Sequence, residues 1–250
     1  MRSIHAIALS LWVLSSLSWA VPAQAGVIIE ATRVIYPAGE SEVTVKLDNQ
    51  GAAPVLVQAW MDNGDPRAAP ETIKVPFNLT PPMARMQPKA GQVLRMIHSG
   101  EPMTQDRESL YWLNVYEIPS KPAGDRSNSL QVALRSRIKV FYRPEGLQGE
   151  PFAAEQALRW SLVRNPEGTG MALKADNPTP YHVSFQSLGV KVGDAVFGQP
   201  DDVRGGMVAP FSAQLFALKG LQTAPGTAEV VGKAINDFGG FDPIQHPLTP

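Results

Sequence analysis

The sequence has 250 residues, of which 44% are hydrophobic and 18% are charged, enough apolar content for one large or two medium hydrophobic cores. Its formal net charge is -1 at pH 7, which excludes a global basic field for nucleic acid, and the sequence has no acidic tail that would indicate a disordered region. It contains no cysteine, which excludes disulfides, thiol catalysis and cysteine-based metal sites.

The N-terminus has the pattern of a secretory signal peptide. Arg2 provides a positive charge, residues 7–17 form an apolar run broken only by serines, and Ala23 and Ala25 form a small-x-small cleavage pattern. The run is shorter than the roughly 20 residues that span a bilayer. A buried N-terminal helix is the alternative interpretation. We predict export without membrane insertion, removal of residues 1–25, and a mature chain that begins at Gly26.

Alternation of apolar and polar residues with a period of two dominates the rest of the chain. It is clearest in four runs, at 43–47, 55–60, 93–97 and 110–115. Such runs are typical of half-buried β-strands, and many short strands at near-regular spacing are typical of an antiparallel sandwich or barrel. No long stretch has the helical period with caps, apart from a weak patch near 153–157.

The longest alternating run covers residues 128–144. Its apolar parity holds Leu130, Val132, Leu134, Ile138 and Val140, and the other parity holds Gln131, Ala133, Arg135, Arg137 and Lys139. Two interpretations fit. The run is either a long central strand with one wet face or an exposed edge strand that needs a partner, because an unpaired edge is an aggregation hazard. The pattern alone leaves both open.

A polar, glycine-containing stretch at 145–151 precedes a new series of strands that starts near residue 158. We place the domain boundary in this stretch, which gives an N-terminal domain of residues 26–147 and a C-terminal domain of residues 148–250. Each domain then has about 100 residues, the usual size of an immunoglobulin-like domain.

No catalytic or metal-binding motif is visible. His98, His182 and His246 lie far apart in the sequence, without a second His or a carboxylate at metal-ligand spacing. The chain has no G-x-S-x-G elbow and no Walker loop, and Gly168-Thr169-Gly170 fits a hairpin turn. We therefore expect no enzymatic activity, no cofactor and no metal site.

Five segments along the chain form one recognisable set. They are ATRVIYP (31–37), QDRESLYWLN (105–114) with EIP (117–119), RIKVFYRP (137–144), NPTPY (177–181) and INDFGG (235–240). In this order they resemble the signature of the PapD-like periplasmic pilus chaperones, a family of immunoglobulin-like sandwich proteins that act by strand donation. The segments span both domains, and five in register are far more specific than any one alone.

The resemblance implies an all-β fold of two immunoglobulin-like β-sandwich domains arranged as an L or boomerang. It also implies a periplasmic chaperone of the chaperone–usher pathway, which binds, stabilises and delivers pilus (fimbrial) subunits by donating an edge β-strand to their incomplete immunoglobulin-like fold. The implied partners are the pilus subunits and an outer-membrane usher. The short connection at 120–129, without flanking cysteines, resembles the short-loop subclass.

The resemblance also assigns residues to subunit binding. Leu130, Val132 and Leu134 match the side chains that the family inserts into the subunit. Arg33 and Lys139 match two basic residues that hold the C-terminal carboxylate of the subunit in the cleft between the domains, by charge-assisted hydrogen bonds.

A third group matches residues with a structural role. Glu108, Arg143 and Asp237 match an ionic cluster that the family places between its domains, which would fix the interdomain angle without touching the subunit. Residues 177–181 match a turn set by proline in the second domain.

Two other functions compete with the chaperone. A secreted β-sandwich adhesin or other binding module would predict an aromatic cluster on loops, but the five Trp fall mostly within strand patterns or the signal segment. A secreted hydrolase would predict a carboxylate or Ser/His constellation, and the sequence shows none.

Overall fold

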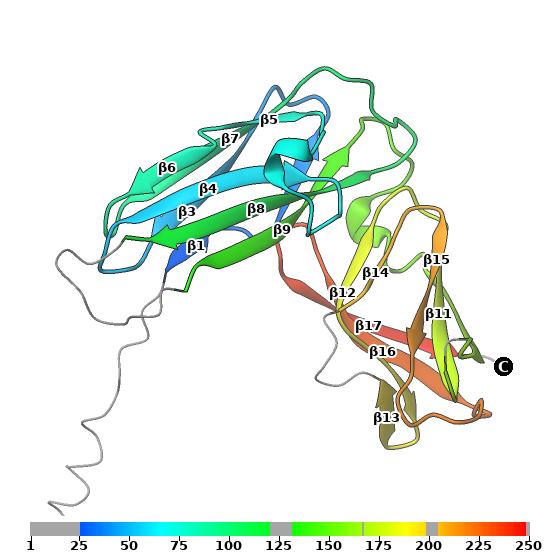
Figure 1. Ribbon diagram of the computed structural model, residues 1–250. Helices are drawn as coiled ribbons and strands as arrows, with labels where there is room; N and C mark the ends of the chain where they lie inside the picture. The colour runs from blue at the N-terminus through cyan, green and yellow to red at the C-terminus, as the bar shows by residue number, and fades with distance from the viewer. Residues whose placement is uncertain (1–25, 121–131, 167, 199–204, 249–250) are drawn as a thin grey trace, which may run out of the picture.

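The computed structural model describes residues 26–120, 132–166, 168–198 and 205–248, which form two all-β domains set as the arms of an L (Figure 1). Domain 1 contains β1 to β9, and domain 2 contains β10 to β17. Two 3₁₀ helices, η2 (Pro70–Thr72) and η3 (Pro151–Ala153), accompany them. Among the described residues, no helix is long and apolar enough to span a membrane.

Domain 1 is a sandwich of two sheets. One sheet has the order β1 (Val27–Ile29), β3 (Val43–Asn49), β7 (Gly91–His98), β5 (Phe77–Thr80). The other has the order β2 (Arg33–Pro37), β9 (Leu134–Arg143), β8 (Ser109–Pro119), β4 (Val55–Asp62), β6 (Met83–Met86). Neighbouring strands are antiparallel except β2 and β9, which are parallel.

Domain 2 is a second sandwich with a core of its own. Its smaller sheet has the order β10 (Arg159–Arg164), β11 (Met171–Asn177), β15 (Ser212–Ala217). The larger has the order β13 (Ala195–Gly198), β12 (Val183–Val192), β16 (Ala228–Ile235), β17 (Phe241–Leu248), with β14 (Met207–Val208) beside β12. The predicted all-β fold of two immunoglobulin-like sandwiches is therefore confirmed.

The alternation in the sequence explains how the strands form the cores. On β3, Val45 and Leu47 are buried in the first core, whereas Lys46 between them is exposed, as the two-residue period of a strand requires. In domain 2, Leu173 and Phe185 are buried in the second core. Burying a large apolar side chain stabilises a fold by roughly 1.5–3 kcal/mol, so each domain has its own source of stability.

Two predicted turns are present in domain 2. The hairpin between β10 and β11 turns at Gly168-Thr169-Gly170, and Gly170 has φ = 85°, a left-handed conformation that favours glycine. The turn at 177–181 is held by the buried Asn177. Its Nδ2 donates to the Tyr181 carbonyl (2.7 Å), and its Oδ1 accepts from the Thr179 N–H (2.9 Å).

Candidate functional site

Strand β9 is paired differently along its two halves. It pairs with β8 over all but its last residue, from Leu134 opposite Glu117 to Tyr142 opposite Ser109. Strand β2 covers the other edge only from Lys139 to Arg143. Among the described residues, no strand pairs with residues 134–138 on that side. The backbone N–H and C=O groups of this half form an open edge to which another strand can be added.

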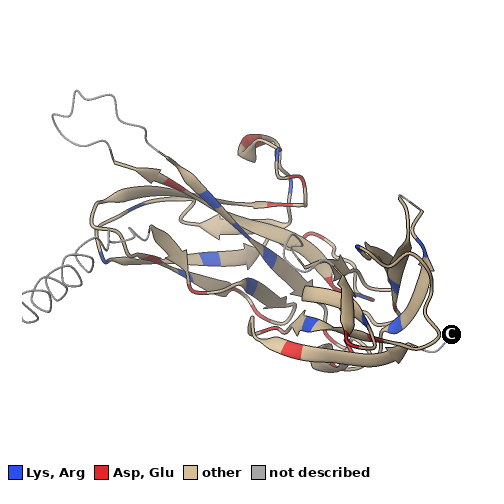
Figure 2. Cartoon of the chain, turned by 90° about the horizontal axis from the view of Figure 1, so that it is seen from below, with Lys and Arg blue, Asp and Glu red and all other residues tan. Residues whose placement is uncertain are grey.

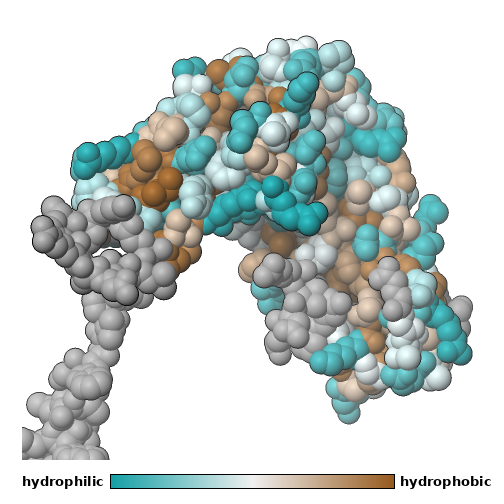
Figure 3. Space-filling model, viewed as in Figure 1, coloured by the Kyte–Doolittle hydropathy of each residue, from teal (hydrophilic) through white to brown (hydrophobic). Residues whose placement is uncertain are grey.

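Apolar side chains are exposed where the open edge begins. Val132 is 61% exposed and Leu134 is 56% exposed, and a brown patch lies at the start of β9 in Figure 3. Both side chains are therefore accessible in the free chain. The third predicted insertion residue, Leu130, lies outside the described residues.

The strand is shorter than the alternating run predicts. The pattern predicts regular extended structure from residue 128, but β9 begins at Leu134, so Val132 precedes the strand. The ladder with β8 stops at Leu134 opposite Glu117, although β8 itself continues for two residues to Pro119, which has no N–H to donate.

Arg33 and Lys139 face each other where the open edge ends. They are directly paired residues in the parallel ladder of β2 and β9. Arg33 Nη1 donates to the Ile235 carbonyl (2.9 Å), and Lys139 Nζ donates to Ser184 Oγ (3.2 Å), so both cations lie against domain 2. Among the described residues, no Asp or Glu forms an ion pair with either of them.

The electrostatics of this basic pair favour an anion. Burial, together with the charge of Arg33, lowers the pKa of Lys139 from 10.5 to about 8. Burial also lowers the pKa of the Arg33 guanidinium, and the negative charges of Asp237 and Glu108 partly offset this lowering. Two partly desolvated cations side by side repel each other, and an incoming carboxylate would relieve both the repulsion and the lost hydration.

Glu108, Arg143 and Asp237 meet at the joint between the domains. Arg143 Nε donates to Glu108 Oε1 (2.8 Å), and Arg143 Nη1 and Nη2 donate to the two carboxylate oxygens of Asp237 (2.7 and 3.0 Å). Arg143 ends β9 and Asp237 lies in the turn between β16 and β17, so the guanidinium bridges the two domains. The structure thus brings together the three residues of the predicted ionic cluster.

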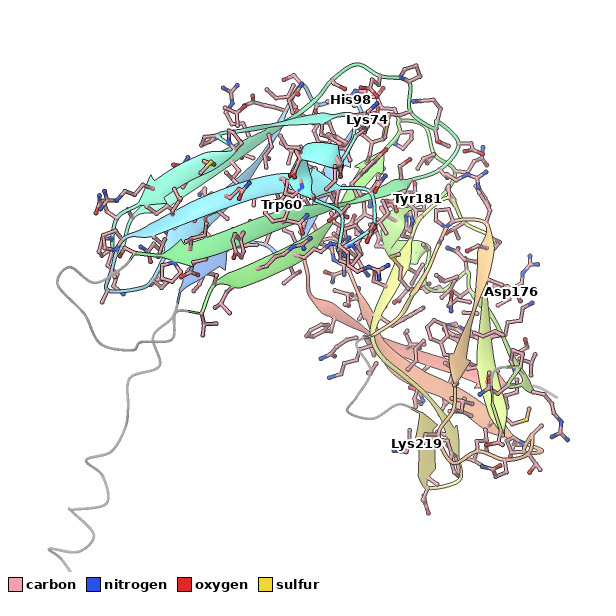
Figure 4. All side chains as sticks on the ribbon, in the orientation of Figure 1. Trp60, Lys74, His98, Asp176, Tyr181 and Lys219 are labelled. Atoms are coloured by element: carbon pink, nitrogen blue, oxygen red, sulfur yellow. The ribbon has the colours of Figure 1, made fainter. Side chains whose placement is uncertain are left out.

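His182 is a fourth member that the sequence analysis missed. Its backbone N–H donates to Glu108 Oε2 (2.8 Å), and its ring Nδ1 lies 3.2 Å from the same oxygen. Its side chain is only 6% exposed and packs on the Phe141 ring. A lone His in the sequence carries no sign of a partner 74 residues away. Tyr181, labelled in Figure 4, lies at this joint, and Arg143 lies over its ring at 5.4 Å.

A second polar group that the sequence analysis missed lies on the outer face of the same sheet. Asp62 on β4 and Asn114 on β8 are fully buried, and they contact Arg137 and Arg135 of β9. Basic positions follow one another along this strand (Figure 2). The alternation marks these arginines only as solvated, because their partners come from strands that the sequence does not place beside them.

The described residues offer no site for a metal ion. No group of three or more His, Cys, Asp or Glu among them could hold one. The chemistry that the geometry does provide is strand addition along 134–138 and anion binding at the basic pair. Two immunoglobulin-like sandwiches joined at an ionic cluster, with one strand left partly open, place the chain in the class of two-domain immunoglobulin-like binding proteins.

Comparison with known families identifies the chain more closely. Residues 26–148 match the family "Pili and flagellar-assembly chaperone, PapD N-terminal domain". Residues 153–246 match "Pili assembly chaperone PapD, C-terminal domain". The chain therefore belongs to the PapD family of pilus assembly chaperones.

Individual relatives agree with this assignment. The chain is 43% identical to the chaperone protein FimB/FhaD of Bordetella pertussis over 253 residues, which cover 99% of this chain and 98% of the relative. It is 43% identical to the probable fimbrial chaperone YadV of Escherichia coli K12 over 220 residues, covering 86% of this chain and 87% of the relative. A crystal structure of the YadV chaperone aligns with a TM-score of 0.74 at 39% identity, covering 89% of this chain and 98% of that structure.

One of the relatives has been solved in complex with a pilin. The SafB chaperone, in complex with the SafA pilin of Salmonella enterica, aligns with a TM-score of 0.71 at 28% identity, covering 92% of this chain and 99% of that structure. The relatives are named chaperones, which is a non-enzymatic role.

Proposed function

We propose that this chain is a chaperone of pilus subunits and that it lends the open edge of β9 to the incomplete fold of a subunit. The observation that carries the proposal is the position of the basic pair: the open edge, residues 134–138, ends directly at Arg33 and Lys139. An added strand could therefore form main-chain hydrogen bonds along β9 while its terminal carboxylate reaches two cations.

The exposed apolar side chains supply a second part of the proposal. The exposed Val132 and Leu134, together with Leu130, which lies outside the described residues, would fill the groove that a missing strand leaves in the subunit. Each buried side chain would contribute roughly 1.5–3 kcal/mol. Because the main-chain bonds do not depend on sequence, these side chains and the basic pair would set the register of the added strand.

The ionic cluster would act on the shape of the protein and not on the subunit. Glu108 and Arg143 belong to domain 1, whereas Asp237 belongs to domain 2, and their hydrogen bonds are already complete in the free chain. Their role would be to fix the angle at which domain 2 stands beside the open edge.

We further propose that the protein works in the periplasm, after cleavage behind Ala25, and that it delivers its subunits to an outer-membrane usher. The pattern of residues 1–25 supports export. A relative described as the periplasmic chaperone SfaE aligns at 32% identity over 88% of this chain. N-terminal sequencing of periplasmic material should give Gly26, and a protein that still begins at Met1 would contradict the location.

Co-purification tests the function. The tagged chain, expressed with its signal segment together with the pilus genes of its own organism, should be recovered from the periplasm as a one-to-one complex with a smaller exported subunit. The Arg33→Ala and Lys139→Ala variants should be recovered alone. Recovery of wild type without any subunit, together with binding to a glycan array, would instead indicate an adhesin.

A further inference from the structure

The outer face of β9 carries a polar cluster that the proposed function has not used. It consists of Asp62 on β4, Asn114 on β8, and Arg135 and Arg137 on β9, and we call it the outer-face cluster. It spans three strands of the sheet, and its two arginines belong to the half of β9 that no described strand pairs with on the side opposite β8.

Asp62 is the centre of the outer-face cluster. Its side chain is fully buried, and its carboxylate accepts from Arg137 Nε (2.9 Å) and Nη2 (2.5 Å), from Asn114 Nδ2 (2.7 Å) and from the Gly64 N–H (2.7 Å). Burial alone would raise the pKa of Asp62, but the hydrogen bonds from Arg137, Asn114 and Gly64 bring it below its ordinary value. The carboxylate is therefore charged and fully engaged.

Arg135 is held by a second set of contacts. Its Nε and Nη2 donate to Asn114 Oδ1 (2.9 and 2.6 Å), and its Nη1 donates to the Pro66 carbonyl (2.6 Å) in the segment that follows β4. Its guanidinium also lies 5.0 Å from the centre of the Trp60 ring, and Figure 4 shows Trp60 on the face of the sheet beside η2.

The same arrangement repeats one step along the strand. The Arg137 guanidinium lies 3.9 Å from the centre of the Trp112 ring. Both arginines thus contact an aromatic ring and a polar group of β8 or β4, so their side chains are fixed although they face outward. Only 30% of the Arg135 side chain and 20% of the Arg137 side chain is exposed.

A strand that is paired on one side only is prone to local opening, because each residue loses half of the ladder that protects it. We propose that the outer-face cluster braces the open half of β9, holding residues 134–138 extended and in register before any subunit arrives. This inference rests on the proposed function for its purpose, but the bracing itself is a property of the free chain. Asp62, Asn114, Arg135 and Arg137 are positioning residues, since none of them would touch the added strand's backbone.

The brace has a consequence for binding. Ordering a flexible segment at the moment of association subtracts from the affinity, and a segment held in its bound conformation avoids that cost. A braced edge would therefore speed capture of a subunit, whereas the basic pair and the inserted side chains would determine how long the subunit stays.

Hydrogen exchange of the free protein tests the brace without any ligand. In Arg137→Ala, amides of 134–138 should exchange roughly tenfold to hundredfold faster than in wild type, the equivalent of losing one hydrogen bond to a charged group. Amides of 139–143, which β2 also pairs, should keep their protection. Arg135→Ala, which removes a more exposed side chain, should give a smaller increase in exchange at the same residues. It replaces Arg137→Ala in this test if that variant folds poorly.

The matched control is Arg95→Ala, which removes an exposed arginine of the other sheet that pairs with Glu42; it should leave exchange at 134–138 unchanged. Equal exchange at 134–138 in wild type and both β9 variants would overturn the proposal, as would uniform acceleration over 134–143 and the core strands.

Stopped-flow mixing with the subunit recovered alongside wild type gives the second readout. The association rate constant of Arg137→Ala should fall while its dissociation rate constant stays near the wild-type value. A change in the dissociation rate constant alone, with an unchanged association rate constant, would overturn the role in capture. If wild type captures no subunit, the proposed function fails, and the exchange comparison still decides whether the brace exists.

Discussion

The two halves of β9 differ in what surrounds them, although one alternating pattern runs through both. Residues 139–143 lie between β2 and β8, their inward side chains are buried in the first core, and their outward side chains meet domain 2. Residues 134–138 have one neighbour and carry an exposed Leu134. The comparison shows that alternation reports which face a side chain is on, but not whether another strand covers the edge.

The largest expected effect comes from removing the buried carboxylate that Arg143 contacts at the paired end of β9. Glu108→Ala would leave Arg143 half-satisfied at a site where the Glu108 side chain is only 2% exposed. Loss of one partner of a buried pair costs about 3–5 kcal/mol, so the denaturant midpoint should fall sharply. Asp237→Ala should cost less, because that side chain is 32% exposed. Glu42→Ala is the control, and a wild-type midpoint for Glu108→Ala would contradict the structural role.

A second prediction concerns the residues at which the two halves meet. Lys139→Ala or Arg33→Ala should leave the circular dichroism spectrum native and reduce subunit affinity by roughly 2–5 kcal/mol, because a carboxylate in the cleft would lose a charged partner. Lys46→Ala, an exposed lysine on β3, should bind normally. Wild-type affinity in both Lys139→Ala and Arg33→Ala would show that these cations do not bind the subunit's carboxylate.

The third prediction is that a substitution in the open half of β9 affects subunit binding, whereas one in the paired half affects folding stability. Leu134→Glu should change the free energy of unfolding by no more than about 0.5 kcal/mol, as surface substitutions do, but it should abolish capture by forcing a charge into an apolar groove. Val140→Ala, at a position with no exposed area, should destabilise the fold by about 2 kcal/mol and leave binding intact. Thermal melting with pull-down on both variants measures the contrast, and insoluble Leu134→Glu would point to a covered strand.

The smallest effect is a pH dependence at the boundary. Burial lowers the pKa of Lys139 to about 8, so the cation is present below that pH and is lost above it. Subunit affinity should therefore weaken above pH 8, by at most about tenfold per pH unit. Lys139→Arg, which stays charged, should bind with little change between pH 7 and 9. An identical pH profile for the two proteins would show that Lys139 does not titrate during capture.

The same titration acts on folding with the opposite sign. The folded chain disfavours the Lys139 cation relative to the unfolded chain, whose lysine titrates near 10.5. Between about pH 8 and 10.5 the unfolded state binds more protons, so this residue's contribution to stability rises with pH. A Lys139→Met variant should accordingly melt higher than wild type at neutral pH while losing capture.

Much of the fold could be predicted from the sequence because the strands alternate cleanly. Val45 and Leu47 fall on the apolar parity of their run, and each is buried. The position where β9 begins could not be predicted in this way. It depends on where the pairing with β8 stops, at Leu134 opposite Glu117, and the pattern of a single segment does not show where its partner strand lies.

The candidate site divides in the same way. The resemblance pointed to Arg33, Lys139, Glu108, Arg143 and Asp237, and the structure places the first two side by side and the last three in contact. It assigned no role to Asp62, Asn114 or His182. Their roles depend on partners 21 to 75 positions away in the sequence, which only the folded topology brings within reach.

The position and direction of β2 limit which polypeptides this protein could accept. Strand β2 begins at Arg33, and it runs parallel to β9 along the same edge that residues 134–138 leave open. A strand added there in the same direction would point its C-terminus straight at the first residue of β2. The start of β2 would then act as an end-stop, with room for a chain that finishes at the basic pair but none for a chain that continues. Selection would fall on true carboxyl termini, and a few residues appended to the end of a subunit would abolish capture as effectively as removing a cation.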